Sequence, residues 1–171
     1  MLTIILVNLL GSMGIVSLWR KFSKFKATPL LLLSFGQCLS AAAANLDSLE
    51  RQLLAAEGAE RVNILNALAE GSATRKPSHA VIYANEALQL SRKLKFRRGE
   101  SEAVYNKAEA LNKQGKYDSS FEMLQKYLKD NEEVMSSLYL GKMNVQLGEI
   151  LTARGKYKDA EQFLSKAVGI H

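Results

Sequence analysis

Residues with catalytic potential are few in this 171-residue chain, and their spacing supports no known chemistry. The Gly-Lys pairs at 115–116 and 155–156 lack the upstream glycine and the following serine or threonine of a phosphate-binding loop. Glu132 and Glu133 are adjacent and diverge on a helix, so we expect them to form an acidic first turn capped by Asn131. Nucleophile-elbow, zinc-protease and dinucleotide-turn motifs are also missing. We therefore predict that the chain is not an enzyme.

The sequence contains few cysteine and histidine residues that could bind a metal. Cys38 is the only cysteine, so an intrachain disulfide and a cysteine-based metal site are both excluded. His79 and His171 are the only histidines, and they lie far apart in the sequence. We predict neither a metal nor a cofactor.

The formal net charge of +6 is concentrated near the amino terminus. Residues 1–44 contain Arg20, Lys21, Lys24 and Lys26 and no acidic residue. The remainder has 19 basic and 17 acidic residues, a net charge of only +2. Because affinity for nucleic acid depends on such charge, we predict no nucleic-acid partner. The basic cluster at 92–98 is expected to be a solvated helix end and linker.

The first 44 residues form a segment of different composition. Leu2–Trp19 carries no charge and is followed by the basic patch RKFSKFK and the apolar run ATPLLLLSFGQCLSAAAA. A basic region, an apolar region and small residues before a cleavage point are the three parts of a secretory signal. We predict a signal peptide or membrane-anchor segment over residues 1–44, with cleavage after Ala43 or Ala44.

The stretch Leu2–Trp19 leaves several interpretations open. Translation from Met13 would leave a signal of ordinary length, whereas the full stretch is just long enough to span a membrane, which requires about 17 to 25 residues. Both interpretations carry Asn45 and everything after it across the membrane. A buried helix of a soluble protein is a further alternative. Lipidation of Cys38 is disfavoured because Gln37, and not a small residue, precedes it.

The rest of the chain has the periodicity of helices. From Leu46 onward, apolar residues recur at spacings of three and four, and no segment alternates as a strand does. We predict an all-α body with a leading helix over residues 45–60 and a repeated unit over residues 61–171.

Two stretches of this body repeat at an interval of forty residues. QGKYDSSFEML occupies 114–124 and RGKYKDAEQFL occupies 154–164. At this interval, matching residues pair at seven positions, namely Ala108 with Gly148, Leu111 with Leu151, Gly115 with Gly155, Tyr117 with Tyr157, Ser120 with Ala160, Leu124 with Leu164 and Leu128 with Val168. A further shift of forty residues towards the amino terminus aligns residues 87–88 with 127–128, so we predict three repeated units.

Each repeated position has a structural reason. Glycine adopts the left-handed conformation that ends a helix, so Gly115 and Gly155 are predicted to close the first helix of a hairpin. Tyr117 and Tyr157 are expected to pack across the hairpin with their hydroxyls in water. Pro77 is expected at the first position of the second helix in the first unit. Small residues are predicted where two helices approach closely, at Ala108, Ser120, Gly148 and Ala160.

The segments AVYNKAEALNKQGKYDSSFEMLQKYL and MNVQLGEILTARGKYKDAEQFLSKAV resemble tetratricopeptide repeats in these small, glycine and aromatic positions. The unit of forty residues exceeds the usual 34 of that family, with extra length in SRKLKFRRGES and KDNEEVMSSLYLG. The resemblance implies a right-handed solenoid of antiparallel helical hairpins, with units at about 61–100, 101–140 and 141–171.

The resemblance also implies a concave groove that binds a protein or peptide ligand. Its side chains are expected on the first helix of each unit, at Glu102, Tyr105, Asn106, Glu109, Asn112, Lys113, Lys142, Val145, Gln146, Glu149, Thr152 and Ala153. Chaperone adaptors of this family hold a carboxylate with lysine and asparagine where this chain has Tyr105 and Glu109. We therefore do not expect co-chaperone activity.

A signal-like segment followed by long repeats resembles the extracytoplasmic sensory part of bacterial membrane histidine kinases. This resemblance implies an exported or membrane-anchored interaction domain, truncated at His171 before an output domain. A complete membrane-tethered scaffold for a protein complex is the main alternative, and a cytosolic peptide-sensing regulator is a third.

Overall fold

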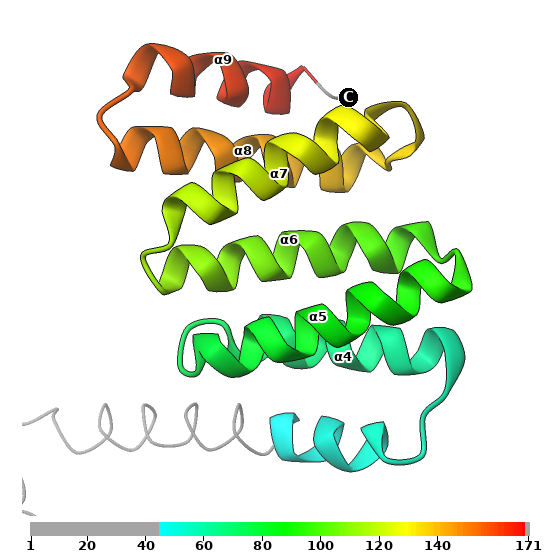
Figure 1. Cartoon of the computed structure of the whole chain (residues 1–171). Helices are drawn as coiled ribbons and strands as arrows, with labels where there is room; N and C mark the ends of the chain where they lie inside the picture. The colour runs from blue at the N-terminus through cyan, green and yellow to red at the C-terminus, as the bar shows by residue number, and fades with distance from the viewer. Residues whose placement is uncertain (1–44, 170–171) are drawn as a thin grey trace, which may run out of the picture. The chain divides into compact units, whose positions relative to one another are not determined.

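All regular structure in residues 45–169, the range that the computed structural model describes, is helical (Figure 1). A helical segment over 45–53 is followed by α4 (Gly58–Ser72), α5 (Pro77–Leu94), α6 (Arg97–Lys113), α7 (Tyr117–Asn131), the short 3-10 helix η1 (Glu132–Val134), α8 (Ser137–Ala153) and α9 (Tyr157–Val168). The predicted all-α class is confirmed for this range. The predicted signal or anchor segment at 1–44 lies outside the described residues.

The helices pair as antiparallel hairpins, α4 with α5, α6 with α7 and α8 with α9. The first helices of neighbouring hairpins also pack on one another, α4 on α6 and α6 on α8. The second helix of each hairpin contacts the first helix of the next, α5 with α6 and α7 with α8. Figure 1 shows these hairpins stacked in chain order from α4 to α9. Contacts between neighbouring units only are the defining feature of a helical-repeat solenoid.

The two Gly-Lys-Tyr turns have the same backbone geometry. Gly115 has φ +74° and Gly155 has φ +73°, both in the left-handed region. In the first turn the Lys116 N–H donates to the carbonyl of Leu111 at 2.9 Å, and the second turn repeats this bond at the same distance. This pairing is the Schellman motif, which satisfies carbonyls at a helix end. Each turn therefore ends one helix and lets the next start within two residues.

Helix α5 ends in the same motif without a glycine. Lys95 takes the left-handed position at φ +55°, and the Phe96 N–H donates to the Ser91 carbonyl at 2.9 Å. Helix α6 then begins directly at Arg97. The segment SRKLKFRRGES, predicted as extra length and linker, is thus helical apart from two residues. The longer repeat comes from longer helices at this point, so the predicted linker is wrong.

Two other expected boundaries also differ in the structure. The leading helix ends at residue 53 and not at residue 60, and Gly58 at φ +58° begins α4. Asn131 is the last residue of α7 and lies at the N-cap position of η1, as expected, but its side chain forms no capping hydrogen bond; its amide donates to the Tyr127 carbonyl at 3.0 Å. Glu132 and Glu133 lie in η1, and α8 begins after Ser136.

The main core runs through the stacked hairpins from α4 to α8. It is built from aliphatic residues and one tyrosine, namely Leu65, Ala87, Leu88, Ala103, Val104, Ala108, Leu124, Tyr127, Leu128, Met143, Leu147 and Ile150. The small residues lie where helices approach: the Ser120 hydroxyl donates to the Ala108 carbonyl at 3.0 Å. A Cβ on Gly148 would lie 2.7 Å from the Leu164 side chain. Close packing of this kind holds α7 on α6 and α9 on α8, and the first helices α6 and α8 carry the site.

Candidate functional site

A polar cavity of about 350 Å³ lies between the first helices of two neighbouring hairpins. Its volume falls at the lower end of the range that ligand pockets occupy. Apart from Tyr117 at the start of α7, its lining comes from α6 and α8. We call it the first-helix cavity, and its lining residues are Tyr105, Glu109, Asn112, Lys113, Tyr117, Gln146 and Glu149.

Two carboxylates and two amide side chains give this cavity its acceptor groups. Glu109 and Glu149 occupy the same repeat position, forty residues apart, and so face the cavity from adjacent helices. Neither carboxylate forms an ion pair within 4.0 Å with another residue of the described range. The amide oxygens Oδ1 of Asn112 and Oε1 of Gln146 are buried and accept no hydrogen bond from the described residues. Gln146 is only 4 % exposed. A buried acceptor without a donor is costly, so the cavity favours a ligand that donates.

The tyrosines beside the cavity lie in an acidic surrounding. Burial raises the pKa of Tyr105, and the carboxylates of Glu109, Glu149 and Glu70 raise it further. Since a negative charge nearby opposes deprotonation, this ring is a neutral phenol at physiological pH. The same three carboxylates make this side of α6 attractive to cations.

One cation of the chain already binds to this face. Lys142 Nζ lies 5.1 Å from the ring centroid of Tyr105 and 5.4 Å from that of Tyr139. The two rings are 6.5 Å apart and tilted by 57°. Burial, followed by the carboxylate of Glu102, raises the pKa of Tyr139. Distances below about 6 Å are those of cation–π pairs, so these tyrosine faces are accessible to positive charge.

The structure brings together about half of the residues predicted for the groove. Six of them line the first-helix cavity, namely Tyr105, Glu109, Asn112, Lys113, Gln146 and Glu149. Glu102 and Lys142 lie beside Tyr139, as described above. Val145 is 39 % exposed on α8. Thr152 bonds its own helix, donating to the Gly148 carbonyl at 2.8 Å, and Ala153 is exposed outside the cavity.

Asn106 is not a groove residue. Its side chain is 3 % exposed, and its amide nitrogen donates to the Asn66 carbonyl at 3.1 Å. The Asn66 amide in turn donates to the Gly99 carbonyl at 3.1 Å. Asn66, Asn106 and Gln146 are spaced forty residues apart, so each unit places a buried amide at the same position. In the first two units this amide ties α4 to α6.

Sequence reasoning missed three residues of this region. Tyr139 was not considered because it precedes the part of α8 that matches the repeat, although its ring lies beside Tyr105. Tyr117 was expected to pack across its hairpin, and it also lines the cavity. Asn66 occupies the same repeat position as Asn106, and the spacing of forty residues between them is the sequence signal that could have identified Asn66.

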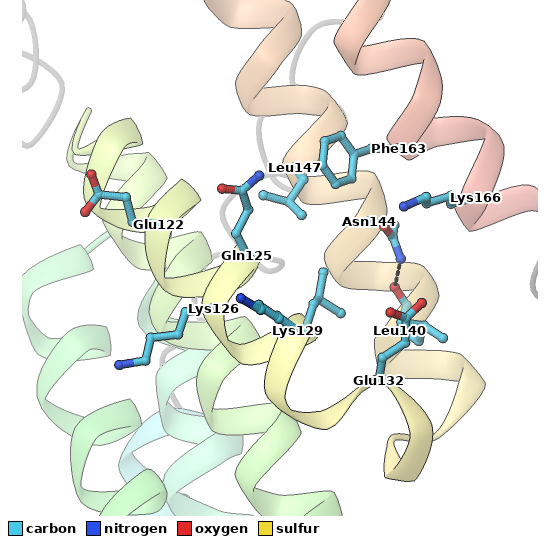
Figure 2. Close-up of a pocket in the computed structure, with 11 residues that line it drawn as sticks. Glu122, Gln125, Lys126, Lys129, Glu132, Leu140, Asn144, Leu147, Phe163 and Lys166 are labelled. Atoms are coloured by element: carbon cyan, nitrogen blue, oxygen red, sulfur yellow. Dashed lines mark hydrogen bonds between the residues drawn. The ribbon is translucent and has the colours of Figure 1, made fainter.

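A second, larger groove lies between α7, α8 and α9, and most of its lining comes from the second helices α7 and α9. It has a volume of about 610 Å³ and is lined by Glu122, Gln125, Lys126, Leu128, Lys129, Glu132, Leu140, Asn144, Leu147, Phe163 and Lys166. We call it the second-helix groove. Figure 2 shows Leu147 and Phe163 on one side and Gln125 and Lys129 of α7 on the other. The buried, unpartnered acceptors of the described chain lie elsewhere, so this groove carries no comparable demand for a ligand.

Other classes of site find no counterpart in residues 45–169. This range contains no cluster of three or more histidine, cysteine or acidic side chains with the geometry of a metal site. Among its helices, none combines the length and apolar character that crossing a bilayer requires.

The fold and this site define a class of protein: a helical-repeat solenoid with a polar cavity on its first helices, an architecture suited to binding other proteins. The tetratricopeptide-repeat family model matches residues 141–170, which cover most of α8 and α9. This match and the helical hairpins together support a tetratricopeptide-repeat protein, a class that serves generally as a non-enzymatic scaffold. Comparisons with curated proteins and with solved structures gave no significant match.

Proposed function

We propose that this chain is a protein-interaction module that binds a peptide segment of a partner along α6 and α8. The observation that carries the proposal is the first-helix cavity, in which residues of two neighbouring units converge. Within residues 45–169, its two buried amide oxygens have no donor and its two carboxylates form no ion pair. Such preformed polar positions fix the orientation and specificity of a ligand.

The proposal also concerns where in the cell the module lies and what kind of protein it belongs to. The module is exported or membrane-anchored, and it is the sensory part of a bacterial signalling protein such as a histidine kinase. Support comes from the order of segments in the sequence: an apolar and basic segment over 1–44 and then the long repeats. In this arrangement the peptide ligand arrives from outside the cytoplasm, and its binding to α6 and α8 is the input.

Site-specific photo-crosslinking tests the binding face. A benzophenone amino acid at Val145, which is 39 % exposed on α8, should capture a partner protein in the native cell. The matched control carries the same group at Gln125, which is exposed on α7 in the second-helix groove. We expect a discrete adduct from position 145 and none from position 125. Equal capture at both positions, or capture at 125 alone, would contradict the assignment of the binding face.

A reporter fusion tests the location separately. Residues 1–50 joined to a phosphatase that is active only outside the cytoplasm should give active enzyme. A matched fusion in which Leu31, Leu32 and Leu33 are replaced by aspartate should be inactive, because three charges destroy an apolar signal core. An inactive parent fusion would rule out export while leaving the binding face untouched.

A further inference from the structure

The first-helix cavity has acceptors that the described residues leave without donors. Two glutamates and two amide side chains line it, namely Glu109, Glu149, Asn112 and Gln146, and the amide oxygens of the last two are buried without a donor among the described residues. The one cation of the lining is Lys113, an exposed side chain at the end of α6. The lining therefore carries two negative charges against one positive charge.

The depth of these acceptors matters as much as their number. Gln146 is 96 % buried, and its Oε1 has no donor within the described residues. Leaving such an atom without a partner destabilises the free protein, and a rotation of the amide that turns this oxygen toward a donor in the cavity removes that cost. A cation that enters the cavity is attracted by the carboxylates of Glu109 and Glu149.

A guanidinium group meets these requirements best. It is planar, permanently charged, and carries five N–H donors and no acceptor. It can serve carboxylates and amide oxygens at once, whereas an ammonium offers three donors from one point. Its flat face also stacks on aromatic rings, and Tyr105 and Tyr117 provide such rings at the wall of the cavity. Lys142 over Tyr105 shows that this ring accommodates a cation on its surface.

We infer that the first-helix cavity is the pocket for an arginine side chain of the partner. This inference rests on the proposed function, because it names the chemistry that the proposed peptide ligand presents. Arginine enters between α6 and α8, and its guanidinium donates to the carboxylates of Glu109 and Glu149, the negatively charged groups of the lining. Lys113 opposes it as a like charge at the cavity edge and so limits its affinity.

A titration with small probes tests the pocket without knowledge of the partner. The full chain, labelled with nitrogen-15, is titrated with N-acetyl-arginine methylamide and, separately, with its neutral counterpart N-acetyl-citrulline methylamide. We expect saturable shifts of the Asn112 and Gln146 side-chain amide signals with the arginine probe. The citrulline probe should bind at least about tenfold more weakly, because it lacks the charge that strengthens these hydrogen bonds. N-acetyl-lysine methylamide should bind several-fold more weakly than the arginine probe.

Variants on the surface of the cavity sharpen the test. The double variant Glu109→Gln and Glu149→Gln should weaken the arginine probe about tenfold and leave the citrulline probe nearly unchanged. Lys113→Met should strengthen arginine binding about two- to fivefold by removing a like charge. Glu122→Gln on α7, which removes a carboxylate from the second-helix groove, should leave arginine binding unchanged. Thermal melting by circular dichroism verifies that each variant keeps its fold.

Several results would overturn the inference. They are equal binding of the arginine and citrulline probes, tighter or equal binding of lysine, shifts located away from α6 and α8, and no binding at all. Each of these leaves the photo-crosslinking result at Val145 intact, so the cationic pocket can fail while the binding face stands. If arginine binds as expected but position 145 captures no partner, the proposed peptide-binding function fails and the pocket chemistry remains.

Discussion

The hairpins α6–α7 and α8–α9 have the same turn and nearly the same sequence pattern, yet their second helices differ in burial. Leu124 of α7 is fully buried, whereas Leu164, at the same repeat position on α9, is 38 % exposed. Tyr117 and Tyr157 differ in the same direction, with 40 % and 69 % exposure. The position of a helix in the array therefore decides its burial, and the residue type does not.

The difference follows from what covers each helix. In the described range α7 packs on α6 and α8, whereas α9 packs mainly on α8. The polar contacts differ too: Ser120 anchors α7 to the Ala108 carbonyl at 3.0 Å, and the corresponding Ala160 has no hydroxyl to do so. In a solenoid each unit is stabilised by its neighbours, so we expect α9 to be held less firmly than α7.

Truncating the matched leucines should give the largest effect. Leu124→Ala leaves a cavity in the core, and we expect it to lower the free energy of unfolding by about 2–5 kcal/mol. Leu164→Ala removes a side chain that is already partly in water, and we expect a loss of about 1 kcal/mol. Urea denaturation followed by circular dichroism measures both.

The ratio of the two losses is the informative quantity. Ile82, which is 62 % exposed on α5, provides a surface control whose change to alanine should cost well under 1 kcal/mol. Equal losses for Leu124→Ala and Leu164→Ala would show that α9 is as well covered as α7, and the comparison between the hairpins would fail.

Enlarging the small residues of the two first helices should have the next largest effect. Gly148→Leu places a side chain where a Cβ alone would meet Leu164 at 2.7 Å and the Ala160 carbonyl oxygen at 3.4 Å. We expect a loss of about 1–3 kcal/mol from overpacking. Ala108→Leu, at the same repeat position, should cost more, because α7 is held from two sides and cannot move away. Melting by circular dichroism tests this order, and no loss for Gly148→Leu would show that no close helix contact exists there.

The turns and the helix type were predictable from the sequence because their causes are local. Gly115 and Gly155 lie at left-handed positions, and the apolar period of 3.6 residues sets the helices between them. The start of α5 at Pro77 was predictable for the same reason. The exact end of α5 was not, because Lys95 adopts the left-handed conformation although it has a Cβ, and only a helix end somewhere in 92–98 was indicated.

The candidate site was predictable only as a set of first-helix positions. The period places Asn106 and Glu109 on one side of α6, but whether a polar residue is buried depends on the neighbouring helix. Asn106 is covered because α4 packs on α6 and offers the Asn66 carbonyl. The pairing of Tyr105 with Tyr139 likewise depends on how α8 lies on α6, which sequence spacing within one helix does not determine.

The smallest effect should come from the two turn glycines, and here the hairpins should behave alike. A Cβ at Gly115 or Gly155 meets nothing within 4 Å, so an alanine there costs only the strain of a left-handed backbone, roughly 1–2 kcal/mol. Because φ is +74° in one turn and +73° in the other, we expect Gly115→Ala and Gly155→Ala to lower the free energy of unfolding equally. Asparagine tolerates this conformation better than alanine, so the matched asparagine variants should recover part of the loss. Urea denaturation of the four variants measures these losses and separates backbone strain from burial. If the loss at Gly115 exceeded the loss at Gly155, as we expect for Leu124 and Leu164, the burial of the following helix would set the cost, and the turn geometry would not.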